Sequence, residues 1–128
     1  MNAAVAKAIS EIQAAFPETP TEIQEDGQGG ASVILGDIPI GELFTPSSTW
    51  IGFRITFQYP YSDVYPHFVR GDLLRKAGAP LGAGITSGHN FLGRPSLQLS
   101  RRSNHLNPQT DTALLKLLKV IQWLRTSP

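Results

Sequence analysis

The sequence contains no cysteine. This absence excludes disulfide bonds, zinc sites built on thiolates and any thiol nucleophile within the chain. A cysteine-free composition is typical of the reducing cytosol, so we expect a cytoplasmic protein. The N-terminal residues also lack a basic stretch followed by a long apolar run, and we therefore expect no signal peptide.

Charge is scarce and nearly balanced. Charged residues make up 16% of the 128 residues, and 11 Lys and Arg against 10 Asp and Glu give a formal net charge of +1. So small a net charge gives no overall attraction to nucleic acid or to an anionic membrane. No apolar run approaches the roughly 20 residues that cross a bilayer. We therefore expect neither a membrane nor a nucleic acid as the main partner.

The apolar content of 41% predicts one globular domain, over residues 1–128, with a core of its own. Apolar residues at helical spacing predict helices at 3–16 and 111–125. Thr110 or Asp111 is expected to cap the second helix. The apolar stripe of that helix is expected to consist of Leu114, Leu117, Leu118, Ile121 and Leu124.

Between the two helices the sequence predicts an antiparallel meander followed by a long loop. Apolar and β-branched residues bounded by turn residues predict strands at 21–25, 31–35, 38–44 and 50–58. Residues 71–93 contain six of the 12 glycines, which predicts a loop with at most one helical turn, at 71–76. Residues 95–99 are expected to be extended. This order predicts an α+β domain whose helices lie on one face of the sheet.

Common catalytic motifs are missing. The chain has no Gly-rich phosphate loop ending in Gly-Lys-Ser/Thr, no His-Glu-x-x-His pair and no Gly-x-Ser-x-Gly elbow. His67, His89 and His105 are widely separated, so each is expected to be a surface or hydrogen-bonding residue rather than a metal ligand. We expect no metal and no other cofactor.

Several short patterns carry a resemblance to a known family. Tyr65-Pro66 follows the clearest predicted strand, Asn90 precedes Gln98 by eight residues, and Pro108 follows Gln98 by ten. In this order and spacing the chain resembles ubiquitin-conjugating enzymes, whose superfamily includes inactive variants and RWD domains. Leu97-Gln98-Leu99-Ser100 resembles the Ile-Cys-Leu-Asp run that contains the family's catalytic cysteine.

The resemblance implies a fold of the ubiquitin-conjugating-enzyme (UBC) type: an antiparallel meander flanked by N- and C-terminal helices. It also implies a bacterial ubiquitin-like modification pathway, with a ubiquitin-like protein or an activating-enzyme-like protein as partner. The family carries its modifier as a thioester, which the amide of Gln98 cannot form. Leu106 stands where the family has Trp, and Gly88-His89 replaces His-Pro. The resemblance therefore favours a scaffold that binds these proteins without a cysteine nucleophile.

Two alternatives to a scaffold stay open. In the first, a serine (Ser96, Ser100 or Ser103) carries the modifier as an oxyester, with His105 as the base and Asn90 as the donor to the developing oxyanion. Ordinary turn hydrogen bonding explains these serines as well. In the second, the chain is an RWD-type interaction module unrelated to modifier transfer.

Arg101 and Arg102 begin the most polar basic run in the chain, which continues to His105. Arginine pairs bidentately with carboxylates, so the two residues are predicted to dock an acidic partner surface or the tail of a modifier. Contact with phosphate is one alternative. A purely structural loop, with its arginines bonded to backbone carbonyls, is another.

Overall fold

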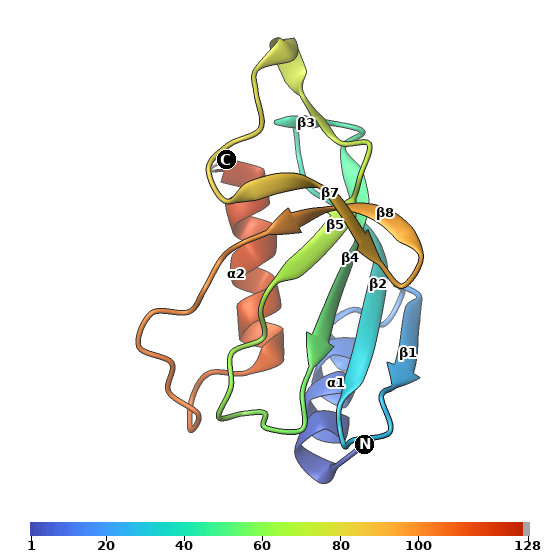
Figure 1. Ribbon diagram of the computed structural model, residues 1–128, viewed down its shortest axis with the longest axis vertical. Helices are drawn as coiled ribbons and strands as arrows, with labels where there is room; N and C mark the ends of the chain where they lie inside the picture. The colour runs from blue at the N-terminus through green and yellow to red at the C-terminus, as the bar shows by residue number, and fades with distance from the viewer. Residues whose placement is uncertain (127–128) are drawn as a thin grey trace.

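Six strands form one antiparallel sheet with the order β1-β2-β4-β5-β8-β7 (Figure 1). The computed structural model describes residues 1–126, apart from the side chain of Ala77, so the last two residues of the predicted domain lie outside the described residues. The strands of this sheet are β1 (Thr21–Glu25), β2 (Ala31–Pro39), β4 (Ser48–Ile55), β5 (His67–Arg70), β7 (Ile85–Phe91) and β8 (Arg94–Leu99).

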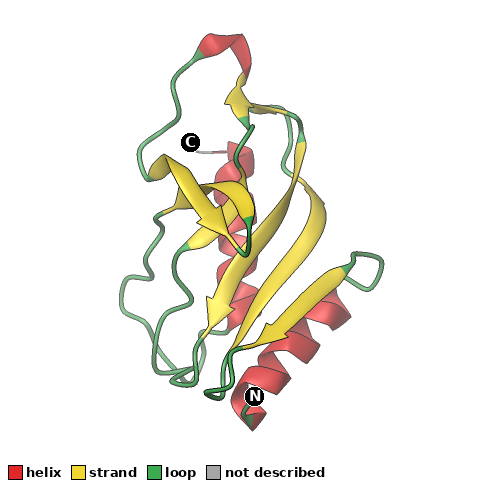
Figure 2. Ribbon diagram, turned by 45° about the vertical axis from the view of Figure 1, so that its right-hand side comes forward, coloured by secondary structure: helices red, strands yellow, loops and turns green. Residues whose placement is uncertain are grey.

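Two helices, α1 (Ala3–Ala15) and α2 (Ala113–Thr126), cover one face of this sheet (Figures 1 and 2). The Asn2 side chain caps α1 by accepting a hydrogen bond from the Val5 amide at 2.9 Å. We call the other face, which carries no helix, the open face. The structure thus confirms an α+β domain with a mostly antiparallel sheet flanked by N- and C-terminal helices.

The main core lies between the helices and the sheet. Period-two alternation along β4 points Ile51, Phe53 and Ile55 toward the helices, and all three are at most 1% exposed. They pack with the buried faces of α1 and α2 in one continuous cluster. The alternate residues of β4 consequently lie on the open face.

A second, two-stranded sheet lies at the end of the molecule where the chain leaves β2. It pairs β3 (Phe44–Thr45) with β6 (Leu74–Arg75), and the 3-10 helix η1 (Lys76–Gly78) follows β6. The prediction of one separate strand at 38–44 is therefore wrong. β2 continues to Pro39, and Phe44 belongs to the small sheet. Pro39 and Gly41 end the pairing because a proline donates no ladder hydrogen bond and Gly41 has a φ of +83°.

The loop predicted at 71–93 is largely structured. Its second half forms β7, which pairs with β8 through a hairpin whose two turn residues, Leu92 and Gly93, have φ of +49° and +83°. Two successive positive φ angles are typical of a tight hairpin turn. The sequence signal was weak because Leu rarely adopts this conformation and a register shift interrupts the strand between Thr86 and His89.

Three smaller predictions also need correction. β4 ends at Ile55 instead of Gln58, so Phe57 is 55% exposed and does not join the core. α2 begins at Ala113, and Thr112, instead of Thr110 or Asp111, caps it by accepting from the Leu115 amide at 3.1 Å. Leu118 is 43% exposed, because the buried face of α2 turns toward Val120 and includes Lys116.

Neither helix of the described chain has the length and apolar character that a membrane crossing requires.

Candidate functional site

Gln98 stands on β8, where the resembling family has its cysteine. The strand register places it opposite Phe68 on β5 and Thr86 on β7, on the open face of the sheet. Its Nε2 donates to Ser100 Oγ at 3.2 Å, and the side chain is half-buried. An amide held in this way offers no nucleophile, so this position can contact a partner but cannot form a covalent bond to it.

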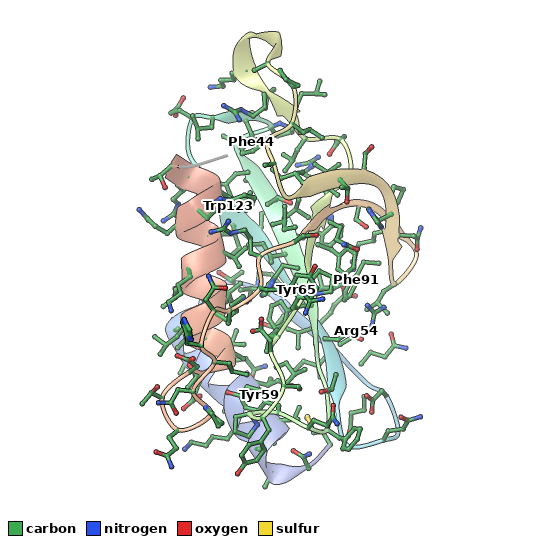
Figure 3. The ribbon with its side chains drawn as sticks, turned by 60° about the vertical axis from the view of Figure 1, so that its left-hand side comes forward. Phe44, Arg54, Tyr59, Tyr65, Phe91 and Trp123 are labelled. Atoms are coloured by element: carbon green, nitrogen blue, oxygen red, sulfur yellow. The ribbon has the colours of Figure 1, made fainter. Side chains whose placement is uncertain are left out.

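An aromatic–arginine cluster lies beside Gln98 on the same face. The Phe91 ring stacks on Phe68 with centroids 4.9 Å apart, and Trp50 stacks on Phe91 at 6.4 Å. The Arg54 guanidinium carbon lies 4.6 Å from the Phe91 centroid, and that of Arg94 lies 5.6 Å from the Trp50 centroid. Figure 3 shows Arg54 and Phe91 on the side of the sheet away from α2. The rings therefore hold both arginines by cation–π contact.

The close packing of the cluster depends on the absence of a side chain at Gly52. A Cβ built at this residue would lie 2.6 Å from Cε2 of Phe91, closer than real side chains approach. The missing side chain lets the Phe91 ring lie directly on β4, where it is fully buried. Gly52 is thus required for close packing of the ring, and its backbone conformation is ordinary.

Hollows surround Arg94 on the open face. Three of them share its side chain, and the largest, about 690 Å³, also borders Trp50 and Asp72. The Arg94 guanidinium pairs with Glu22 at 2.7 Å, so its charge is balanced. Aromatic rings, arginine and adjoining hollows are the composition found at the centres of protein–protein interfaces.

Three of the residues predicted for oxyester chemistry lie in or near the β7–β8 hairpin, and none of the three has a side-chain hydrogen bond to a histidine, although the register places His89 opposite Ser96. Asn90 Oδ1 accepts from the Gly93 amide at 3.0 Å within the hairpin turn. Ser96 is 2% exposed, and its Oγ has no hydrogen-bond partner within the described chain. Ser100 Oγ accepts from Gln98. These groups serve the hairpin and its packing.

Ser103 belongs to a separate arrangement on the helix side, which we call the polar lock: Asp63, Ser103 and Lys116. The Asp63 carboxylate accepts from the Ser103 amide at 2.7 Å and from its hydroxyl at 2.8 Å. Lys116 Nζ donates to both Asp63 oxygens, at 3.0 and 3.1 Å, and to Ser103 Oγ at 2.9 Å. The lock ties the segments before β5 and after β8 to α2.

The polar lock has a structural role and does not activate a nucleophile. Burial alone would raise the pKa of the Asp63 carboxyl, but the hydrogen bonds from Ser103 and Lys116 outweigh it and hold that pKa below its usual range. All three protons of the Lys116 ammonium are directed at acceptors, so Lys116 is not a free base. Ser103 therefore has a stable acceptor for its proton but no base able to activate it.

His67 lies in the core next to the polar lock, which corrects the prediction of a surface or hydrogen-bonding histidine. Its ring is fully buried, lies tilted against the Phe53 ring with centroids 5.2 Å apart, and has no hydrogen-bond partner within residues 1–126. Burial, together with the nearby charge of Lys116, lowers its pKa to about 3, although Asp63 opposes the shift. His67 is neutral at physiological pH. The prediction is confirmed for His89, whose Nε2 bonds to Thr86 Oγ1 at 2.8 Å, and for the exposed His105.

A basic hollow of about 450 Å³ opens between α2 and the segment that follows β8. Arg101 and Arg102, predicted to dock a partner, both line it. The guanidinium carbon of Arg101 lies 4.8 Å from the centroid of Trp123, and that of Arg102 lies 4.1 Å from the centroid of Tyr65. The other charged or titratable residues of the lining are His105, Asp111, Lys116 and Lys119. Of the predicted catalytic residues, only Ser103 and His105 share this hollow, and no hydrogen bond joins them.

Several residues of these sites escaped the sequence analysis. Asp63 and Lys116 are 53 positions apart, and Trp50 and Arg94 are 44 apart, so only the folded chain brings them together. One signal was present: Lys116 occupies a position on the apolar side of α2, where a charge needs a partner. No spacing in the sequence indicated which carboxylate that partner would be.

No group of three or more His, Asp and Glu side chains suited to a metal ion occurs within residues 1–126. Comparisons with protein-family models, with curated proteins and with solved structures give no match to this chain. The open face and the basic hollow are the two candidate binding surfaces of the described chain.

Proposed function

We propose that this chain is a protein-binding module of the ubiquitin-conjugating-enzyme type, in a bacterial ubiquitin-like modification pathway. It holds a ubiquitin-like protein on its open face without forming a covalent bond to it. An activating-enzyme-like protein is the alternative partner. The module needs no cofactor for this role.

The observation that carries the proposal is the setting of Gln98. Where the resembling family has its nucleophile, this chain has an amide bonded to its own neighbour Ser100. The same face carries the aromatic–arginine cluster, whose rings and guanidinium groups suit contact with another protein. Binding capacity and the lack of a nucleophile thus occur together on one surface.

The order of elements supports the resemblance on which the proposal rests. A helix precedes an antiparallel meander, Tyr65-Pro66 leads into β5, a hairpin separates Asn90 from Gln98, and a long helix follows Pro108. The helix, the antiparallel strands, the Tyr-Pro step and the final helix follow the order that the UBC type implies, whereas β7 lies where a long loop was expected. The residues predicted for an oxyester lie apart or are engaged in structural hydrogen bonds, which favours the scaffold over the carrier.

The first test is co-expression with the proteins encoded beside its gene, followed by gel filtration and intact mass measurement with and without hydroxylamine. The proposal predicts a stable complex with a ubiquitin-like protein and an unmodified mass for both chains. A hydroxylamine-sensitive adduct would contradict it in favour of the serine carrier. The absence of any complex would contradict it in favour of an RWD-type module with another partner.

A second test concerns Gln98 itself. Because its amide is bonded within the chain, Gln98→Ala should leave the affinity for the ubiquitin-like protein nearly unchanged. A tenfold loss, about 1.4 kcal/mol, would show that Gln98 makes a direct contact with the partner. Calorimetric titration of the two variants side by side decides between these results.

A further inference from the structure

The basic hollow carries more positive charge than the surrounding protein balances. Arg101, Arg102 and Lys119 line it, and none of them has an ion pair or hydrogen bond with the rest of the described chain. Lys116 is already neutralised by Asp63 at 3.0 Å. Asp111 is the one carboxylate in the lining, and its Oδ2 accepts from the Asn107 amide at 2.8 Å. Three unbalanced cations consequently face one opposing charge.

The two arginines are held in place before any ligand arrives. The face of Trp123 supports Arg101 and the face of Tyr65 supports Arg102, while the planar N–H groups at the edges of both guanidinium groups remain available. The polar lock fixes the segment that carries both arginines by tying the next residue, Ser103, to α2. Such pre-positioning lowers the entropy cost of binding an anion.

The arrangement of donors favours phosphate over carboxylate. Arg101 and Arg102 rest on different rings, so two separate guanidinium groups line the hollow, whereas one guanidinium is enough for the planar fork with a carboxylate. Lys119 reaches it from α2. A tetrahedral dianion accepts hydrogen bonds from several directions at once and balances about two positive charges. The volume of about 450 Å³ lies within the range of small-molecule sites.

We infer that the basic hollow is a binding site for the phosphate group of a small phosphomonoester, held by Arg101, Arg102 and Lys119. The inference does not rest on the proposed protein partner, because that partner is assigned to the open face. It extends the role of the two arginines from docking an acidic surface to binding a discrete ligand.

The experiment is a calorimetric titration of the full chain with inorganic phosphate, adenosine monophosphate, adenosine, citrate and a single-stranded oligonucleotide. Inorganic phosphate and the monophosphate should bind with one-to-one stoichiometry and a Kd of about 1 mM or tighter, and adenosine should not bind. Citrate binding as tightly as phosphate would overturn the assignment of phosphate. An oligonucleotide binding more tightly than the monophosphate would overturn it in favour of nucleic acid.

Matched variants place the ligand in the hollow. Arg101→Gln with Arg102→Gln should weaken phosphate binding at least tenfold, about 1.4 kcal/mol. Arg54→Gln is the control, because it also removes an arginine stacked on a ring, 4.6 Å above Phe91, but on the open face. An equal loss in the control, or no loss in the double variant, would overturn the proposed site. Far-ultraviolet circular dichroism confirms that each variant is folded.

Discussion

Each of the two tryptophans carries an arginine over its ring, but the two pairs lie in different settings. Trp50 and Arg94 lie on the open face, and Trp123 and Arg101 lie at the basic hollow beside α2. Arg94 is also paired with Glu22 at 2.7 Å, whereas Arg101 has no carboxylate partner within the described chain. The same stacking motif is therefore nearly neutral on one surface and positive on the other. This difference suits the first surface to a protein and the second to an anion.

The largest effect is expected from removing the polar lock, which ties the segments before β5 and after β8 to α2 beside the basic hollow. Asp63→Ala leaves the ammonium of Lys116, whose side chain is 9% exposed, without its partner. An uncompensated buried charge should lower the free energy of unfolding by about 3 kcal/mol. Urea denaturation followed by tryptophan fluorescence measures the change.

The control for this prediction removes both charges together. Asp63→Ala with Lys116→Met should recover most of the lost stability, because an apolar pair of similar volume is often no worse than a buried ion pair. If the double variant is no more stable than Asp63→Ala, the charge of Lys116 is not the cause. The free energy of unfolding, in that case, depends on Asp63 for another reason.

The next effect is a loss of stability in mild acid caused by His67. An unfolded histidine has a pKa of 6.5, whereas that of buried His67 is about 3. Between these values the unfolded chain binds a proton that the folded chain does not, so stability falls as the pH falls. The unfolding free energy should be about 2 kcal/mol lower near pH 5 than near pH 7. Denaturant titrations at the two pH values test this.

His67→Leu should abolish most of that pH dependence, and His89→Gln should leave it intact. Asp63 does not contribute in this window: its pKa is lowered, so its stabilising effect is present above the unfolded value and is lost only as the pH falls through the still lower folded value. A pH dependence unchanged in His67→Leu would show that another group is responsible.

A smaller effect is expected on the open face, at Gly52. Gly52→Ala places a methyl group against Phe91, so the ring must move, and the unfolding free energy should fall by about 1–2 kcal/mol. The same substitution in a Phe91→Ala background should cost much less, which a double-mutant cycle measures. An equal loss of unfolding free energy in the two backgrounds would mean that the packing of Phe91 does not require a glycine at position 52.

The smallest effect concerns the exposed ion pair that balances Arg94. Glu22→Gln should change the unfolding free energy by less than about 0.5 kcal/mol, because both side chains are largely accessible to water. It should, however, leave Arg94 as unbalanced as Arg101 and give the open face weak affinity for anions. Phosphate titration of this variant shows whether charge balance alone separates the two surfaces.

The sequence predicted the elements whose periodicity is strong and missed those fixed by tertiary contact. The stripe of Val5, Ile9 and Ile12 identified α1 because every buried residue repeats at helical spacing. β7 escaped prediction because most of its residues are exposed at a sheet edge and give no apolar alternation. Lys116 was not singled out from the sequence, since its partner Asp63 comes from a segment without periodicity.

The candidate sites divide in the same way. Arg101 and Arg102 could be singled out from sequence because they are adjacent, and both line one hollow. The aromatic–arginine cluster could not, because register brings its members from β4, β5, β7 and β8 to one face. The UBC-type fold stays a prediction. The proposed binding of a ubiquitin-like protein is best tested on the open face.

The most direct measurement is the affinity of the ubiquitin-like protein for Trp50→Ala and for Trp123→Ala. Both variants remove a tryptophan that carries an arginine, and they differ in the surface that they alter. We predict a loss of affinity of at least tenfold, about 1.4 kcal/mol, for Trp50→Ala, and an unchanged affinity for Trp123→Ala. A loss confined to Trp123→Ala would contradict the assignment of the protein partner to the open face.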